Sequence, residues 1–263
     1  MTPDAPRRRA GGTPLNRSLA RGLLILRAFR PGWTTVSNAE LVAQTGLSKA
    51  TVSRLAQTLV QEGLLQVDPH TRAYSLAPSV LSMAHAMRTG SRLLQVARPH
   101  MQALALQQGL NVGLAAPDGL DMVYLESLRH HRRAALRQVV SGQRIPIALT
   151  SLGHAHLASL DEPAREQLLR ALRQRHSARD WPALRAAMDE ACAHVAAHGW
   201  CQASWQPGVL AMATPLVLAE GHYALNLSLD DSHAPDAPSR RALARQLLAL
   251  RESVMLELHA MPS

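Results

Sequence analysis

Residues Asn38–Gln61 read NAELVAQTGLSKATVSRLAQTLVQ, and this stretch decides the fold of the N-terminal region. Ser37, directly before it, can cap a first helix, and Glu40 is spaced to close a capping box with that serine. Ser48 can cap a second helix, and Gly46 supplies the glycine that a short turn between two helices often uses. The pattern therefore predicts a helix-turn-helix.

The second helix has two different faces when it is drawn at about 100° per residue. The packed face is apolar and consists of Val52, Leu55, Ala56 and Leu59. The outer face is short, polar and mildly basic, and such side chains can bind base edges in a major groove. On this face we expect Ala50, Ser53, Arg54 and Gln57. A solvated face of an ordinary helical hairpin has the same pattern, so the context decides between the two interpretations.

The start of the second helix suits contacts to phosphates, at Ser48, Lys49 and Thr51. A helix before the pair can open at Asn16 or Ser18, with Arg17 and Arg21 on its outer side.

A wing is predicted after the second helix. Residues 64–76 contain two short extended runs around an Asp-Pro turn, which is typical of a β-hairpin. Thr71 and Arg72 at its tip suit contacts to the DNA backbone or to the minor groove. Three helices followed by a hairpin within about sixty residues favour a winged helix over an isolated helical pair.

The charge distribution favours nucleic acid as the partner of this region. Residues 1–76 hold ten Lys and Arg against four Asp and Glu, which gives +6 of the chain's formal +9. An excess concentrated in the first third of the chain is what binding to a phosphate backbone requires. Residues 1–15 are rich in Pro, Gly and Arg without periodicity, and we expect a disordered basic tail there.

The bulk composition permits two domains. The chain has 263 residues, of which 47% are hydrophobic, so each domain can bury a core. There is no apolar run of about eighteen residues, which excludes a membrane-spanning helix. Only Cys192 and Cys201 occur, so no disulfide framework is expected and a cytoplasmic location fits.

Several segments resemble the IclR family of bacterial transcription regulators. Ser18–Leu26 is similar to that family's first helix, Leu47–Leu55 to its recognition helix, Glu62–Leu65 to the exit of the recognition helix, and Tyr74–Pro78 to the end of its wing. The resemblance covers nearly the whole chain from Asn16 onward. It implies a winged helix-turn-helix domain at 16–77, a linker helix at 78–90 and a GAF-like effector-binding domain at 91–263.

The pattern of elements after the linker agrees with an α+β domain that contains one antiparallel sheet. A long helix precedes a hairpin at 111–127, and Pro99 within it is expected to kink the helix or to lie near the start of a second segment. A further strand is expected at 134–140. Helices are expected at about 150–160, 162–175 and 183–198. Strands follow at 199–203, 210–218 and 222–229, and a last helix spans about 239–259.

Two constellations in this second domain suggest chemistry that their spacing does not support. Cys192 and His194 point about 160° apart on a helix, so they cannot share one metal ion. His154 and His156 are two apart on a helix, and no Gly-x-Ser-x-Gly elbow accompanies them. We therefore expect no metal, no cofactor and no catalytic residue, and we expect His154 at a surface or interface.

A third constellation resembles the family's effector pocket. Gly142–Pro146 is similar to the family's Gly-x-Arg-x-Pro, and the strands at 211–216 and 224–228 match the strands that follow it. The resemblance assigns the effector to Ser151, Leu152, Gly153, Ala211, Asn226 and Ser228. Asn226 and Ser228 share one face of a strand, although an exposed sheet face would have the same pattern. Trp205 and Met212 are expected to enlarge the pocket or make it more apolar, which favours a hydrophobic or aromatic carboxylate.

These observations predict a transcription regulator that binds a double-stranded operator as a homodimer or dimer of dimers. A small organic acid in the second domain would modulate that binding. The alternative is an enzyme with an N-terminal head that recruits it to DNA or to a partner. It requires converging titratable residues in the second domain, and the sequence offers none at convincing spacing.

Overall fold

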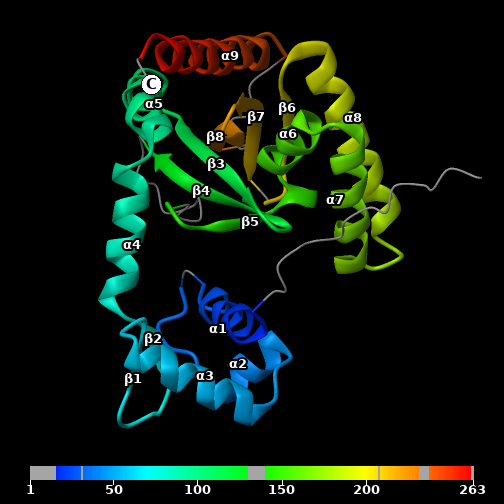
Figure 1. Ribbon diagram of the computed structural model, residues 1–263. Coiled ribbons are helices and arrows are strands. Elements are labelled where there is room, and N and C mark those ends of the chain that lie inside the picture. Colours follow the sequence, from blue (N-terminus) through cyan, green and yellow to red (C-terminus); the bar gives the residue numbers. More distant parts are fainter. Residues whose placement is uncertain (1–15, 31, 130–139, 207, 231–236, 262–263) are drawn as a thin grey trace, which may run out of the picture. The chain divides into compact units, whose positions relative to one another are not determined.

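The computed structural model describes residues 16–30, 32–129, 140–206, 208–230 and 237–261 (Figure 1). The chain divides into two compact units, Met1–His85 and Ala86–Ser263. The predicted basic tail at 1–15 lies outside the described residues.

The N-terminal unit is a three-helix domain with a two-stranded wing. Its elements are α1 (Arg17–Arg27), α2 (Asn38–Thr45), α3 (Lys49–Gln61), β1 (Leu65–Val67) and β2 (Tyr74–Leu76). The strands β1 and β2 are antiparallel, and an isolated bridge joins Val36 to Tyr74. The helix-turn-helix, the helix before it and the predicted hairpin are all present.

Side-chain caps fix the start of each helix in this unit. Asn16 accepts hydrogen bonds from the backbone of Ser18 and Leu19 at 3.1 Å. Ser37 and Glu40 form the predicted capping box, and Ser48 caps α3. These caps satisfy backbone N–H groups that a helix start leaves unpaired, and each is worth about 1 kcal/mol.

The core of the N-terminal unit lies where the three helices meet. Ile25, Leu41, Val52 and Ala56 are fully buried, and Leu65 joins them from the wing. The packed face predicted for α3 is therefore its buried face, with Leu55 half-buried at the edge. This packing fixes the rotation of α3 about its axis and so decides which side chains face outward.

Helix α4 (Pro78–Thr89) follows the wing, and the division between the two units falls within it. None of its residues is buried. Its exposed apolar side chains are Leu81, Met83 and Met87. In its first turn Ser79 donates to the carbonyl of Gly63, and in its last turn Arg88 donates to the carbonyl of Leu125.

The C-terminal unit is built on one six-stranded antiparallel sheet in the order β5-β4-β3-β8-β7-β6. The strands are β3 (Asn111–Asp118), β4 (Asp121–Leu128), β5 (Arg144–Pro146), β6 (Cys201–Ala203), β7 (Val209–Leu218) and β8 (Gly221–Asp230). The helices are α5 (Arg92–Gln108), α6 (Ser151–Ser159), α7 (Glu162–Arg175), α8 (Trp181–His198) and α9 (Ala237–Ala260), with a short 3-10 turn, η1 (Ile147–Leu149), before α6.

Each face of the sheet carries its own apolar core. Helices α5 and α9 cover one face, where Met101, Met212, Leu227 and Leu247 are buried. Helices α6, α7 and α8 cover the other, where Met122, Leu152, Leu172 and Met188 are buried. Alternate residues of a strand point to opposite faces, so both cores draw on the same strands.

Helix α5 runs through Pro99 as one helix, and it ends at Gly109 in the left-handed conformation. Of the strand predicted at 134–140, all but Val140 lies outside the described residues, and Val140 itself is not in a strand. The short edge strand β5 was not predicted, and Arg144 ties it to the β3–β4 turn through ion pairs with Asp118 and Asp121.

A β-bulge interrupts the pairing of β3 with β4. Leu114 pairs with Glu126, whereas the next residue, Ala115, pairs with Tyr124. Leu125 is therefore an extra residue on β4, and the side chains beyond it change faces. The bulge changes which side chains of β4 share one face of the sheet.

Candidate DNA-binding surface and effector pocket

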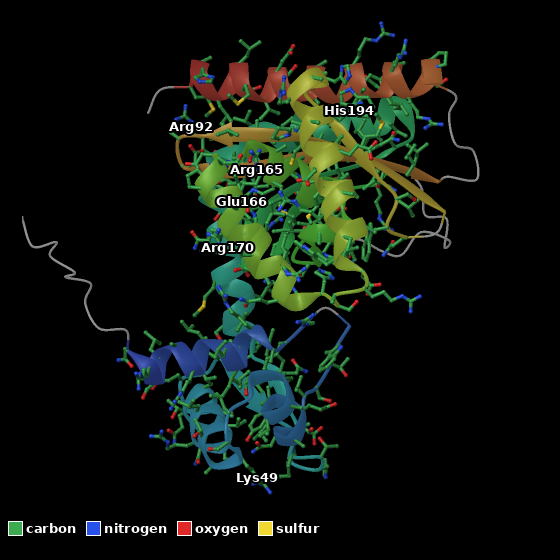
Figure 2. The ribbon with its side chains drawn as sticks, turned by 90° about the vertical axis from the view of Figure 1, so that its right-hand side faces the viewer. Lys49, Arg92, Arg165, Glu166, Arg170 and His194 are labelled. Carbon is green, nitrogen blue, oxygen red and sulfur yellow. The ribbon has the colours of Figure 1, made fainter. Side chains whose placement is uncertain are left out.

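The outer face of α3 is available to a ligand. Lys49, Ala50, Arg54 and Gln57 are all exposed. The Lys49 side chain extends from the end of the N-terminal unit into solvent (Figure 2). No acidic side chain lies on this face of α3 between Lys49 and Gln61. The face can therefore donate hydrogen bonds to bases and phosphates without carboxylate repulsion.

Ser53 and Thr51 are less accessible than their neighbours on α3. Ser53 is half-buried, and its hydroxyl accepts a hydrogen bond from the Asn38 side-chain amide at 2.6 Å. The Thr51 hydroxyl lies 2.9 Å from the Ser48 hydroxyl at the helix cap. These contacts orient the start of α3 against α2, whereas Lys49, Arg54 and Gln57 extend as long exposed polar side chains on the same face.

The wing tip is organised by Asp68. Its carboxylate accepts hydrogen bonds from the backbone of His70 at 2.7 Å and of Thr71 at 2.9 Å, and these bonds lower the pKa of Asp68. Arg72 has a φ of 59°, which is uncommon for a residue other than glycine. Thr71 and Arg72 are exposed, as are Arg17 and Arg21 on α1. All of the DNA-contacting residues predicted from sequence thus belong to the N-terminal unit, and only Thr51 and Ser53 are partly covered.

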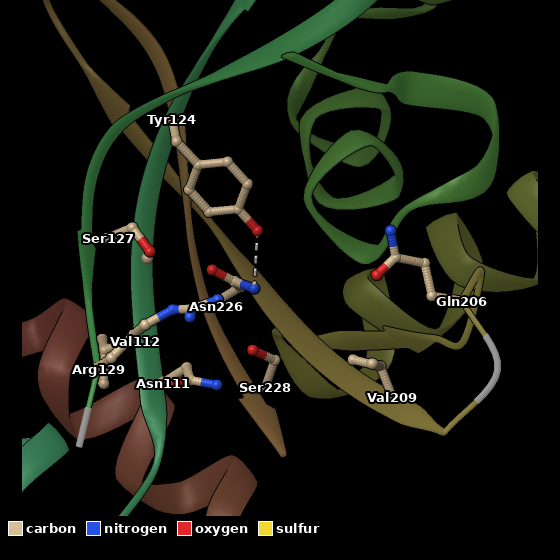
Figure 3. A pocket seen from close by; sticks show the side chains of 10 residues that line it. Asn111, Val112, Tyr124, Ser127, Arg129, Gln206, Val209, Asn226 and Ser228 are labelled. Carbon is tan, nitrogen blue, oxygen red and sulfur yellow. Dashed lines mark hydrogen bonds between the residues drawn. The ribbon is translucent and has the colours of Figure 1, made fainter. Parts of the chain in front are cut away.

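A small polar cavity lies on the sheet face that carries α6 (Figure 3). Residues of β3, β4, β7 and β8 form its walls together with Arg129, after β4, and Gln206, between β6 and β7. Its lining residues are Asn111, Val112, Gly113, Tyr124, Ser127, Arg129, Gln206, Val209, Asn226 and Ser228. The cavity volume is about 30 Å³. That is the space of roughly one water molecule, so a larger ligand requires the walls to move apart.

The β4 bulge brings two of these side chains together. Tyr124 and Ser127 are three positions apart and would face opposite sides of a regular strand. The extra residue Leu125 removes that alternation, so Tyr124 and Ser127 both line the cavity. Simple alternation along the sequence could not have found this pair.

Tyr124 and Asn226 line the cavity, and both residues are buried. The Asn226 amide nitrogen donates to the Tyr124 hydroxyl at 3.4 Å. Burial raises the pKa of Tyr124 to about 12, so the phenol keeps its proton at neutral pH. Gly113 lies beneath both side chains, and a Cβ at that position would lie 2.5 Å from the Tyr124 ring and closer still to Asn226 Oδ1. Glycine is therefore required here for space and not for its backbone conformation.

The predicted effector residues fall in two places. Asn226 and Ser228 line the cavity, and Ala211 lies opposite Ser228 in the β7–β8 register. The other three, Ser151, Leu152 and Gly153, are buried in the first turn of α6 and are not among the lining residues. The Gly153 N–H already donates to Thr150 at 3.2 Å, and a Cβ at Gly153 would overlap the Ile147 backbone.

Two apolar residues expected near the pocket lie elsewhere. Met212 belongs to the core under α5 and α9, on the opposite face of the sheet, because it alternates with Ala211 and Ala213. Trp205 is 36% exposed and does not line the cavity. The expectation that they enlarge the pocket was therefore wrong for this structure.

The histidine and cysteine constellations have other roles. His154 is buried rather than on the surface, and its ring nitrogen lies 3.1 Å from the Ala148 carbonyl. Burial lowers the pKa of His156 to about 4, with a further contribution from His222. His194 lies 2.7 Å from the Trp200 carbonyl. Within the described part of the chain, no three His, Cys, Asp or Glu side chains are arranged to hold a metal ion.

Comparisons with known proteins agree across both units. Residues 18–69 match the IclR helix-turn-helix domain, and residues 85–254 match the C-terminal domain of bacterial transcriptional regulators of the IclR type. Over its described ranges, the chain has no helix with the length and apolar character needed to cross a membrane.

Individual relatives are regulators of the same kind. The HTH-type transcriptional regulator TsaQ1/TsaQ2 of Comamonas testosteroni is 41% identical over 177 residues, which is 66% of this chain and 62% of that protein. The crystal structure of an IclR family regulator from Brucella abortus has a TM-score of 0.84 at 32% identity and covers 94% of this chain and 93% of that one.

A third relative was solved with a ligand. The IclR homologue from Microbacterium hydrocarbonoxydans in complex with 4-hydroxybenzoate has a TM-score of 0.69 at 22% identity, covering 93% of this chain and all of that one (100%). At this identity the likeness concerns the fold alone. Family members of this kind are transcriptional regulators and not enzymes. The chain belongs to the IclR family and is a DNA-binding transcriptional regulator with a helix-turn-helix domain and an IclR-type C-terminal domain.

Proposed function

We propose that operator binding by this regulator is modulated by a small organic acid, an aromatic carboxylate, held in the cavity of the C-terminal unit. The observation that carries the proposal is the chemistry of the cavity walls. Arg129 is a cation in the lining, and no carboxylate is found among the described lining residues. Hydroxyl and amide groups from Asn111, Ser127 and Ser228 complete a lining suited to an anion.

Two observations support an aromatic ligand. The Tyr124 ring and the Val209 side chain supply apolar surface beside the polar groups. A relative with the same fold binds 4-hydroxybenzoate, which makes that acid the natural first probe.

The small volume of the cavity supports a regulatory role for the ligand. A benzoate-sized ligand does not fit into about 30 Å³, so it must bind a wider state of the pocket. A ligand that binds one of two states shifts the population toward that state. In the wider state we expect Ala211 to contact the ligand, because it lies beside Ser228.

The route from the pocket to the linker helix runs through the β4 bulge. Tyr124 and Ser127 line the pocket, and between them lie Leu125 and Glu126. Arg88, in the last turn of α4, donates to the Leu125 carbonyl and pairs with the buried Glu126 carboxylate at 2.8 Å. A shift of the bulge therefore moves the groups that hold the end of α4. This coupling is part of the proposal.

On DNA, we propose that α3 enters the major groove with Arg54 and Gln57 at base edges and Lys49 at a phosphate. One such helix contacts too few base pairs for useful specificity, so two copies are needed on a pseudo-palindromic operator. The exposed apolar side chains Leu19, Leu23 and Leu24 on α1 supply a surface that a second copy can cover. A homodimer or dimer of dimers is the expected assembly.

Thermal unfolding and calorimetric titration of the full chain test the effector proposal. We expect 4-hydroxybenzoate to bind and to raise the unfolding temperature, whereas the uncharged 4-hydroxybenzamide should not. Arg129→Gln should weaken binding of the acid about tenfold or more, because it removes a hydrogen bond to a charged group. Arg170→Gln is the matched control, since Arg170 is exposed on α7 and does not line the cavity (Figure 2). The proposal would be refuted if the acid and the amide raised the unfolding temperature equally, or if the two variants bound the acid with equal affinity.

A further inference from the structure

The Asn226 side chain is a buried polar group that the protein leaves half satisfied. Asn226 is 3% exposed, and its amide nitrogen bonds to the Tyr124 hydroxyl. Its carbonyl oxygen, Oδ1, is buried and has no hydrogen-bond partner among the described residues. Most buried side-chain acceptors in proteins are paired, so an unpaired one inside a pocket needs an explanation.

Tyr124 complements this acceptor with a donor. Its hydroxyl accepts from the Asn226 amide, which leaves the phenol proton available. Burial keeps that proton in place at neutral pH, because the pKa of Tyr124 rises to about 12. The pocket lining thus contains one acceptor and one donor on neighbouring side chains (Figure 3).

Gly113 leaves the space that the Asn226 and Tyr124 side chains occupy. Both side chains reach across β3 at Gly113, which pairs with Asn226 on β8 and lacks the Cβ that would collide with them. The same glycine pairs with Ser127 on β4, another lining residue. Gly113 of β3 therefore lies between two lining residues, Ser127 on β4 and Asn226 on β8.

A hydroxyl group satisfies both partners at once, because it donates one hydrogen bond and accepts another. We infer that Asn226 and Tyr124 form a hydroxyl-recognising subsite, in which a ligand hydroxyl donates to Asn226 Oδ1 and accepts from the Tyr124 hydroxyl. The ligand class is then a hydroxylated organic acid, with its carboxylate directed to the Arg129 part of the lining. The inference rests on the proposed function, since it assigns specificity within the same pocket.

The test compares three para-substituted acids on the full chain by calorimetric titration. We expect 4-hydroxybenzoate to bind about tenfold or more tightly than benzoate, because benzoate leaves the buried acceptor unpaired. The ether oxygen of 4-methoxybenzoate only accepts hydrogen bonds, so this acid should bind no better than benzoate. Preference for the methoxy compound would overturn the inference, since the pair would then present a donor only.

The variant Asn226→Leu separates recognition from folding. Leucine has a similar shape and removes the unpaired acceptor, but it also removes the amide that donates to the Tyr124 hydroxyl. These two effects oppose each other, so the free protein should unfold close to the parent temperature. Its preference for 4-hydroxybenzoate over benzoate should fall to about twofold or less. The control Ser228→Ala changes a lining residue outside the pair and should keep the preference.

The outcomes distinguish this inference from the proposed function. If no acid binds the parent protein, the proposed function fails. If benzoate and 4-hydroxybenzoate bind the parent equally, the hydroxyl subsite fails and the acid-binding pocket stands. An Asn226→Leu variant that keeps the full preference would also overturn the subsite.

Discussion

Substitution of Gly113 by alanine should damage the pocket and the C-terminal unit together. The added Cβ would lie 2.5 Å from Cε1 of Tyr124. Ordinary contacts between carbon atoms are about 3.5–4.0 Å, so the overlap is roughly 1 Å. Neither neighbour is the mobile end of a long side chain, because Tyr124 is a buried ring and Asn226 is short and buried. The side chains or the strand must shift.

The cost follows from this overlap. Overpacking of a core typically costs about 1–3 kcal/mol. Replacing glycine by alanine returns about 0.4–1 kcal/mol by restricting the unfolded chain. The net loss is about 1–2 kcal/mol, which lowers the unfolding temperature of a unit of 150–250 residues by roughly 3–6 °C. Displacement of Tyr124 and Asn226 should also reduce the affinity for 4-hydroxybenzoate at least about tenfold.

Differential scanning calorimetry and acid titration of the Gly113→Ala variant measure both effects. Gly22→Ala is the control, because a Cβ at Gly22 in α1 meets nothing within 4 Å. There alanine should be neutral or stabilise the protein by up to about 1 kcal/mol. A Gly113→Ala protein that unfolds at the parent temperature and binds the acid with parent affinity would refute the close packing described for this site.

Three further predictions concern other parts of the molecule. Arg54→Ala should reduce the preference for operator over scrambled duplex by about 10–100-fold, as measured by fluorescence anisotropy. Lys49→Ala should weaken binding to both duplexes, and it should lower the slope of log affinity against log salt concentration by about one. Arg88→Ala should leave acid affinity within about threefold of the parent, but it should bring the ratio of the operator Kd values with and without acid close to one, because it removes the contact that couples the two sites. Arg98→Ala, at an exposed residue 3.6 Å from the same Glu126 carboxylate, should keep the parent ratio. The pKa of His156 is lowered to about 4 in the folded protein, so between pH 6.5 and 4 the unfolded chain binds more protons than the folded one. The free energy of unfolding should therefore fall by up to about 3 kcal/mol as the pH drops from 6.5 toward 4. Urea unfolding of His156→Leu should show a shallower pH dependence, and an unchanged slope would exclude this histidine as the cause.

The N-terminal unit was predictable because its signals are local. Ser37, Glu40 and Ser48 lie within four residues of the backbone groups they cap, so spacing alone identifies the helix starts. The apolar stripe of α3 repeats at helical spacing, and its burial confirms the predicted rotation. Which of the exposed side chains contact DNA is a prediction that awaits binding data.

The C-terminal pocket was predictable only in part. Asn226 and Ser228 alternate correctly on a regular strand, and both line the cavity. Tyr124 and Ser127 escaped prediction because a bulge breaks the alternation of β4. Gly113 escaped because its role depends on two side chains from β4 and β8, which are distant in sequence. Contacts of this kind are set by strand register, which the composition of one strand does not specify.

The most direct test of effector control over DNA binding is the affinity of the full chain for its operator with and without an acid effector. The operator duplex can be selected from random DNA, and fluorescence anisotropy then gives its Kd at fixed salt. At a saturating concentration of 4-hydroxybenzoate we expect the Kd for the operator to change about fivefold or more, while the Kd for scrambled duplex stays constant. An unchanged operator Kd, with binding of the acid confirmed by calorimetry in the same buffer, would contradict the claim that the pocket controls DNA binding.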